Sequence, residues 1–260
     1  MTVLILAVNT NYTKTTPFEE RIRLIKKAGF KSVIMTWNGS DVFQDELLCV
    51  KENGLRIESV HAPFHMMNDL WTDERPMDSL IKLHGAIDSC HNFAIKTLVV
   101  HPTDTTEPPA VSNCGKTYFK GLIRYAKSMD VELAFENIER PEYLDVIFGE
   151  CDDTNVKLCY DVGHENCFSK GSDVLAKYGD RLKTLHIHDN DGTADQHIIP
   201  FDGNIDYSKF IAKLKKLDFY GIIALEVMRN RTDMYNDLSD EQFLDKAFSA
   251  AVKLFEMRQG

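Results

Sequence analysis

The amino-acid sequence predicts a (β/α)8 TIM barrel formed by a single domain over residues 1–260. Its length of 260 residues is close to the roughly 250 that one such barrel typically needs. Apolar, β-branched runs alternate with longer amphipathic stretches, which is the pattern of βαβ units in a parallel sheet. Histidine and acidic residues recur where those runs end. No Ser/Gly-rich linker or charge block interrupts the alternation, so we place no domain boundary.

The strands are predicted from runs that are apolar throughout rather than at every second position. Such continuous hydrophobicity is expected of a parallel strand buried on both faces. Eight runs have this character, and they occupy residues 3–9, 32–37, 56–62, 97–102, 132–137, 156–162, 182–188 and 221–227. Eight strands separated by helices imply closure into a barrel, in which the carboxyl ends of all strands share one face.

The helices are predicted from the amphipathic stretches that separate and follow these runs. They cover residues 18–29, 41–54, 77–94, 116–130, 142–153, 173–180, 208–221 and 240–257. Three of them end near Gly29, Gly54 or Gly221, and glycine suits the residue that follows a helix.

Composition narrows the function classes. The net charge of -10 argues against broad nucleic-acid binding, which usually needs a basic face. The apolar start MTVLILAVNT lacks the basic region of a secretory signal, and no segment has the length of a membrane span. We therefore expect a cytoplasmic protein with no membrane partner. None of the six cysteines forms a CxxC pair, so we expect reduced thiols. Cys159 is interpreted as a buried thiol, with a metal-bound thiolate as the alternative.

Four residues at the ends of the last four strands form the strongest candidate site: Glu136, Asp161, His186 and Glu226. Carboxylates with one imidazole suit Mn²⁺, Mg²⁺, Co²⁺ or Zn²⁺ better than a closed structural zinc site. Two carboxylates from different strands can also exchange protons with a substrate, which makes Glu136 and Glu226 the candidate catalytic residues. The alternative is that both are isolated acids in ion pairs. A buried acid is costly without such a partner, and this favours the site.

A second set of residues occupies similar positions and contains His61, His101, His164, Asp195 and His197. Asp195 and His197 lie two residues apart, on one side of an extended segment. The set could bind one or two further metals, hydrogen-bond substrate hydroxyls, or orient the ligating carboxylates.

Three further residues are candidates for contacting a substrate. His188 follows the seventh strand and either contacts substrate or shields a metal. Trp37 ends the second strand, where it would stack on a sugar or pack in the core. Arg229, with Arg231 nearby, follows the eighth strand, the usual place for a phosphate site in this fold. The alternative for these arginines is a hydrated loop.

The strand-end motifs also occur in a recognisable order: HAPF, VVHP, FEN, YDVGH, LHIHDNDG-x-x-D-x-H-x-x-P and LEV. This ordered set resembles the xylose isomerase-like TIM barrels, and in particular their sugar phosphate isomerase/epimerase branch. The resemblance implies a divalent metal at Glu136, Asp161, His186 and Glu226, with both glutamates also acting in proton transfer. The related endonuclease IV has a three-zinc site with nine ligands. This chain has a residue for all nine, namely the four above together with His61, His101, His164, Asp195 and His197.

The expected function is therefore a metal-dependent isomerase or epimerase of a sugar or sugar phosphate. The expected partner is a small-molecule sugar rather than nucleic acid, and a homo-oligomer stays open. One alternative is a phosphodiesterase on abasic DNA that resembles endonuclease IV. Another is a barrel that binds a metal or sugar without turnover.

Overall fold

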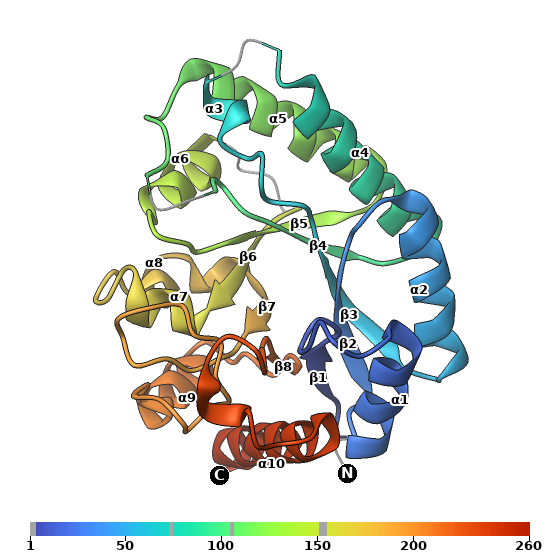
Figure 1. Cartoon of the computed structure of the whole chain (residues 1–260). Coiled ribbons are helices and arrows are strands. Elements are labelled where there is room, and N and C mark those ends of the chain that lie inside the picture. The colour runs from blue at the N-terminus through green and yellow to red at the C-terminus, as the bar shows by residue number, and fades with distance from the viewer. Residues whose placement is uncertain (1–3, 73–74, 105–106, 151–154) are drawn as a thin grey trace.

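A computed structural model describes residues 4–72, 75–104, 107–150 and 155–260. Within them, eight strands form one parallel sheet with the order β7-β6-β5-β4-β3-β2-β1-β8. Their bounds are β1 Leu6–Asn9, β2 Ser32–Thr36, β3 Arg56–His61, β4 Thr97–Val100, β5 Glu132–Glu136, β6 Val156–Asp161, β7 Leu182–His186 and β8 Ile223–Leu225. The predicted (β/α)8 fold is confirmed (Figure 1).

The sheet closes on itself just beyond the last residue of β7. Backbone hydrogen bonds join Ile187 N to Ala224 O at 3.0 Å and Glu226 N to Ile187 O at 2.9 Å. On the other side of β8, Leu6 of β1 pairs with Ile223 in parallel. The loops that follow β1, β7 and β8 are therefore neighbours at one end of the barrel.

The helices surround the strands in Figure 1. Eight correspond to the predicted stretches: α1 Phe18–Ala28, α2 Ser40–Glu52, α4 Met77–Asn92, α5 Asn113–Ser128, α6 Glu142–Glu150, α8 Val174–Tyr178, α9 Tyr207–Lys216 and α10 Asp240–Gln259. The short helices α3 Asp69–Thr72 and α7 Val162–Cys167 lie outside the predicted helices, and α7 begins at the last residue of the sixth predicted strand. Residue 3 of the first predicted strand and residues 151–153 of the fifth predicted helix lie outside the described residues.

Local chemistry explains where the helices begin and end. α1 buries Ile22 and Ile25 on one face and stops at Gly29, whose φ of 111° suits a residue without Cβ. α5 starts earlier than predicted because the Ser112 hydroxyl accepts a hydrogen bond from Gly115 N at 3.1 Å. Among the described residues, none of the helices is both long and apolar enough to cross a bilayer.

Two small groups of inward-facing residues fill the barrel beneath its carboxyl end. One group contains Ala7, Ile34 and Ala224, and the other contains Val99, Ala134 and Cys159. Side chains two residues apart on a strand share one face. Residues that follow these by two, such as Glu136 after Ala134, therefore point into the same interior one layer higher. This packed layer supports the residues at the carboxyl ends of the strands.

Candidate metal centre

Four predicted ligands come together at the carboxyl end of the barrel. Donor atoms of Glu136, Asp161, His186 and Glu226 all lie within 4.8 Å of one another. His186 Nδ1 is 2.9 Å from Glu136 Oε1 and 3.4 Å from Glu226 Oε2. The Glu136 side chain is 1% exposed, whereas that of Glu226 is 14% exposed. The Glu136 carboxylate is therefore almost fully buried, and that of Glu226 is partly exposed.

Asp161 is held so that one of its oxygens is left without a partner. Its Oδ1 accepts a hydrogen bond from His164 N at 2.7 Å and so caps α7. Asn137 holds the same strand end, because its Nδ2 donates to Asp161 O at 2.7 Å and its Oδ1 accepts from Asp161 N at 2.8 Å. Asp161 Oδ2 is buried and has no hydrogen-bond partner among the described residues. Such an orphaned oxygen is costly unless a cation or donor satisfies it.

A second group consists of His61, His101 and Glu136. His61 Nδ1 donates to the carbonyl oxygen of Ala62 at 2.7 Å, so a neutral His61 has its lone pair on Nε2. That Nε2 lies 3.2 Å from His101 Nε2 and 3.3 Å from Glu136 Oε2. His101 Nε2 is itself 3.1 Å from Glu136 Oε2. Three atoms that can donate electron pairs thus face one another.

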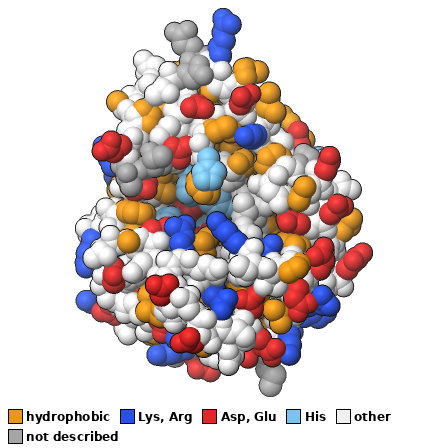
Figure 2. Space-filling model, viewed as in Figure 1, with side chains coloured by type: hydrophobic (Ala, Val, Ile, Leu, Met, Phe, Trp, Pro, Cys, Tyr) orange, Lys and Arg blue, Asp and Glu red, His pale blue; other side chains and the backbone are white. Residues whose placement is uncertain are grey.

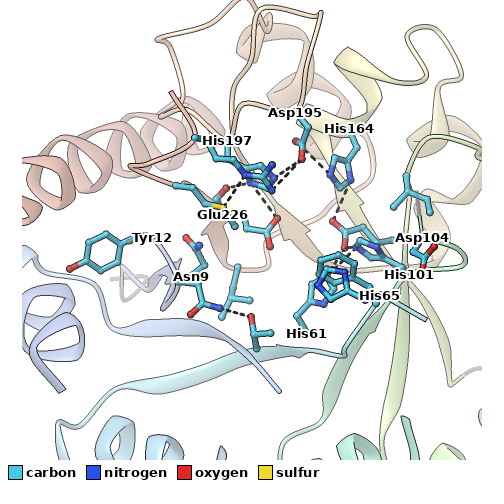
Figure 3. Close-up of a pocket in the computed structure, with 18 of the residues that line it drawn as sticks. Asn9, Tyr12, His61, His65, His101, Asp104, His164, Asp195, His197 and Glu226 are labelled. Atoms are coloured by element: carbon cyan, nitrogen blue, oxygen red, sulfur yellow. Dashed lines mark hydrogen bonds and ion pairs between the residues drawn. The ribbon is translucent and has the colours of Figure 1, made fainter. Parts of the chain in front are cut away.

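A third group combines His164, His188, Asp195 and His197. His197 Nδ1 donates to Glu226 O at 2.8 Å, which leaves Nε2 facing Asp195 Oδ2 at 2.9 Å. His164 Nδ1 lies 3.0 Å from Asn137 O, with Nε2 3.7 Å from Asp195 Oδ1. Asp195 Oδ1 is buried without a hydrogen-bond partner among the described residues. Figure 3 shows His164, Asp195 and His197 converging at the edge of the pocket.

The hydrogen bonds and carboxylate contacts of these histidines suit the binding of a cation. Backbone carbonyls fix the Nδ1–H tautomer of three histidines, an outer contact typical of metal-ligating imidazoles. Each free lone pair then faces a carboxylate oxygen, and two electron-rich atoms at this separation repel unless a proton or metal lies between them. The residues present therefore fit a divalent cation in the first group and leave donor sets for further cations in the other two.

The electrostatics of the cluster agree with this fit. Burial opposes ionisation of Glu136, but His186, His101 and His61 outweigh it and hold the pKa of Glu136 well below its ordinary range. Burial also disfavours the charged form of His164, yet Asp161 and the other carboxylates raise its pKa well above 6.5. Glu136 stays ionised, and the negative charge that attracts protons to the histidines would attract a metal equally well.

Cys159 lies beneath this cluster, close to Glu136 and His186. Its side chain is fully buried, and burial raises the pKa of the thiol to about 12. A neutral thiol is the interpretation made from the sequence, and these observations agree with it. The other described cysteines are also free thiols, and Cys151 lies outside the described residues.

A pocket of about 730 Å³ opens over residues of all three groups. This is within the usual size range of small-molecule sites. Glu136, Glu226 and Asp195 are among the residues that line it. Figure 2 shows histidine side chains at the bottom of a hollow, with Lys or Arg side chains beside it. The pocket gives a small molecule direct access to the Glu226 carboxylate.

The three residues predicted to contact substrate do not line this pocket. Trp37 packs against α4, where its Nε1 donates to Ser89 Oγ at 2.9 Å. The Arg229 guanidinium turns away to Leu238 O and lies 3.4 Å from Asp240. His188 is fully buried and stacks on His197 with ring centroids 4.0 Å apart. Its Nε2 is 3.5 Å from Asp195 Oδ1, which makes it a member of the third group instead, and 3.1 Å from Asp161 Oδ1 of the first group.

Other pocket residues carry no strong signal in the sequence. Asn9, Lys14, Arg21 and His65 all line the pocket. Lys14 and His65 lie in segments that follow predicted strands, and this position is the one clue that could have selected them.

Comparisons with known proteins agree with the fold. A family model described as "xylose isomerase-like TIM barrel" matches residues 22–246. The chain is 30% identical to the uncharacterized protein y4fM of Sinorhizobium fredii over 92% of this chain and 90% of that protein. It is 27% identical to the uncharacterized protein MJ1311 of Methanocaldococcus jannaschii, in a match that spans 64% of this chain and 63% of that protein.

Solved structures with similar architecture include enzymes and a zinc-containing protein. D-psicose 3-epimerase from Clostridium cellulolyticum H10, solved with D-tagatose, has a TM-score of 0.78 at 13% identity, covering 98% of this chain and 99% of that one. The IolI protein with a bound zinc atom has a TM-score of 0.79 at 19% identity, covering 97% and 98%. At such identities, the likeness concerns the fold.

Proposed function

Because the chain belongs to the family of xylose isomerase-like TIM barrels, we propose that it is a divalent-metal-dependent isomerase or epimerase acting on a sugar. One observation carries this proposal. Glu136 and Glu226, from different strands, both approach His186 Nδ1, at 2.9 and 3.4 Å, directly beneath a pocket of small-molecule size. Paired carboxylates beside a ligand set are what carbon–hydrogen proton transfer requires.

Glu136, Asp161, His186 and Glu226 would hold the metal. Their three carboxylates and one imidazole suit Mn²⁺, Zn²⁺, Mg²⁺ or Co²⁺. When bound, the metal supplies a Lewis acid that makes the carbon–hydrogen bond next to a sugar carbonyl more acidic. A sugar-epimerase structure and a zinc-containing structure of the same fold support this choice of chemistry.

The exposure of the two glutamates suggests different roles for them. Glu226 reaches the pocket surface, so its carboxylate is the group that would take the proton from carbon. Isomerisation that returns the proton to the adjacent carbon on the same face needs only this base. Epimerisation needs a second group on the opposite face, and Glu136 is the candidate, although its low pKa favours a role as a ligand.

The alternative of a phosphodiesterase like endonuclease IV has one observation in its favour. All nine residues expected from that resemblance lie in the three groups described above. The net charge of -10 argues against it, because phosphate neutralisation by Lys and Arg supplies most of the affinity for duplex DNA.

The test is solvent exchange. Protein purified without chelator, with its metal content measured, is incubated in deuterated water with a panel of ketopentoses and ketohexoses, their phosphates and the corresponding keto sugar acids. We expect deuterium at the carbon next to the carbonyl of at least one sugar. An abasic duplex is assayed in parallel. Cleavage of that duplex with no exchange into any sugar would replace the proposal with the nuclease. Neither activity would favour the binding barrel without turnover.

A further inference from the structure

We propose that Lys14 and Arg231 bind an anionic group of the substrate. The substrate would then be a sugar phosphate or a sugar acid rather than a neutral sugar. This inference rests on the proposed function only in taking the bound molecule to be a sugar.

The two cations share one side of the pocket. Lys14 lies in the loop after β1, and Arg231 lies in the segment after β8. β1 and β8 are paired, and Arg229 N donates to Tyr12 O at 2.7 Å, so the two segments run against each other above the sheet. Lys or Arg side chains lie beside the hollow in Figure 2. Neighbouring loops therefore present both charges to the same volume.

Both side chains are available to a ligand. Lys14 is exposed and has no hydrogen bond or ion pair within the described part of the chain. The Arg231 side chain is 48% exposed, and its nearest carboxylate oxygen, Asp195 Oδ2, is 4.0 Å from Nη2. Its Nε contacts the Met228 thioether, which is a weak acceptor. Most of its five N–H donors remain free.

A third cation of the pocket is already engaged. Arg21 Nη1 donates to Thr10 O at 2.7 Å and to Asn11 Oδ1 at 3.1 Å. These contacts hold the loop after β1 in place. Arg21 is thus a structural residue of the rim, and it adds positive charge behind Lys14 without competing for a ligand.

The charges around the pocket are unevenly distributed. Asp104 and Glu139 line the opposite side, in the segments that follow β4 and β5. An anionic substituent is therefore attracted to the side formed by Lys14 and Arg231 and repelled from the other. This polarity would direct the uncharged end of the sugar toward Glu226. The overall charge of -10 confines the attraction to this rim, which suits a small anion better than a polyanion.

The experiment measures binding of three open-chain compounds to the metal-loaded protein: glucitol, glucitol 1-phosphate and gluconate. They differ only in the group at one end, and none is a substrate. The variants are Lys14→Gln/Arg231→Gln and a control, Lys31→Gln/Arg124→Gln, with the same charge change. Lys31 lies before β2 at the other end of the barrel, and exposed Arg124 donates to Lys120 O of its own helix. Calorimetric dissociation constants are compared.

Charge-assisted hydrogen bonds predict that one anionic compound binds about tenfold or more tightly than glucitol. The identity of that compound assigns a phosphate or a carboxylate. In Lys14→Gln/Arg231→Gln the preference should disappear while glucitol binding stays within about twofold, and the control should resemble the unchanged protein. Equal binding of all three compounds, or a preference that survives the double substitution, overturns the inference.

The outcome is separable from that of the proposed function. Loss of anion preference in the variant, without deuterium exchange into any sugar, leaves the anion site standing and removes the isomerase. Exchange into neutral sugars with no anion preference does the reverse. If the double substitution instead weakens cleavage of an abasic duplex, the two cations contact a phosphodiester and the small-molecule assignment is wrong.

Discussion

Glu132 and Glu136 stand at the two ends of the same strand, β5, in opposite chemical settings. Glu132 forms an ion pair with Lys183 and lies 3.8 Å from Lys157 Nζ. Glu136 has no lysine or arginine beside it among the described residues, and its contacts are histidines whose available nitrogens face carboxylates. One carboxylate is neutralised by the protein itself, whereas the other requires a proton or a cation.

The two ends of β5 therefore have different roles. At the amino end of β5, ordinary ion pairs link Glu132 to β6 and β7, and such pairs contribute modestly to stability. The carboxyl end collects donors that do not satisfy one another, and it therefore binds something from outside. In this fold, the residues that carry out chemistry lie at the carboxyl ends of the strands, and residues at the other end contribute to stability. Four experiments test whether the two ends of β5 differ in this way.

The largest expected effect is that of Glu226→Gln. Gln keeps a carbonyl oxygen that can coordinate weakly but cannot accept a proton. We expect exchange of the substrate hydrogen to fall by about a hundredfold to ten-thousandfold. Metal content must be measured in the same sample, because metal loss would imitate the result. Glu132→Gln is the matched control at the other end of the barrel and should leave the exchange rate nearly unchanged. Near-normal exchange by metal-replete Glu226→Gln would show that Glu226 is only a ligand.

The next effect is that of metal removal on stability. A cation that binds only the folded protein stabilises it by about 2.7 kcal/mol at a hundredfold excess over its dissociation constant. Chelation should therefore lower the melting temperature, and readdition of Mn²⁺ or Zn²⁺ should restore it. In Glu132→Gln the shift should be the same size, because its ion pairs lie at the other end. A melting temperature indifferent to chelator, in protein shown to have lost its metal, would argue against the carboxyl-end cluster as a cation site.

Gly163→Ala should cause a smaller but specific loss. A methyl group at Gly163 would overlap the His188 imidazole, whereas at Gly149 of α6 it would meet no atom of the described residues within 4 Å. Overpacking typically costs about 1–3 kcal/mol. Chemical denaturation should show this loss for Gly163→Ala, and Gly149→Ala should be neutral or slightly stabilising. If His188 supports the third group, Gly163→Ala also lowers the metal content per chain. An unchanged metal content would limit His188 to packing.

The smallest effect is the pH dependence of metal affinity. The pKa values of His164 and His186 are raised well above 6.5 in the metal-free protein, where nearby carboxylates outweigh the effect of burial. A cation must displace those protons, so affinity should rise with pH across the range above 6.5 and fall on acidification. One displaced proton changes affinity by about tenfold per pH unit, or 1.36 kcal/mol. Calorimetry in buffers of different ionisation enthalpy counts the protons released. An affinity that is flat with pH would show that neither histidine titrates on binding.

The barrel fold, and the position of the main site at the carboxyl ends of its strands, follow from local sequence patterns. Strand periodicity is local, so a run such as ELAFEN places Glu136 at a strand end and on the same face as Ala134 wherever the strand lies. Barrel closure then brings the ends of all strands together. For this reason the sequence predicts that four side chains lie together, namely those of Glu136, Asp161, His186 and Glu226.

Which loop side chains face the pocket depends on contacts between distant parts of the chain. Trp37 and Arg229 had suitable positions in the sequence, but their hydrogen-bond partners, Ser89 and Leu238, come from elsewhere and turn them away. Lys14 and Arg231 lie at opposite ends of the chain and meet because β1 pairs with β8. The orientation of a loop side chain depends on such non-local partners, whereas the direction of a strand residue depends on its own backbone.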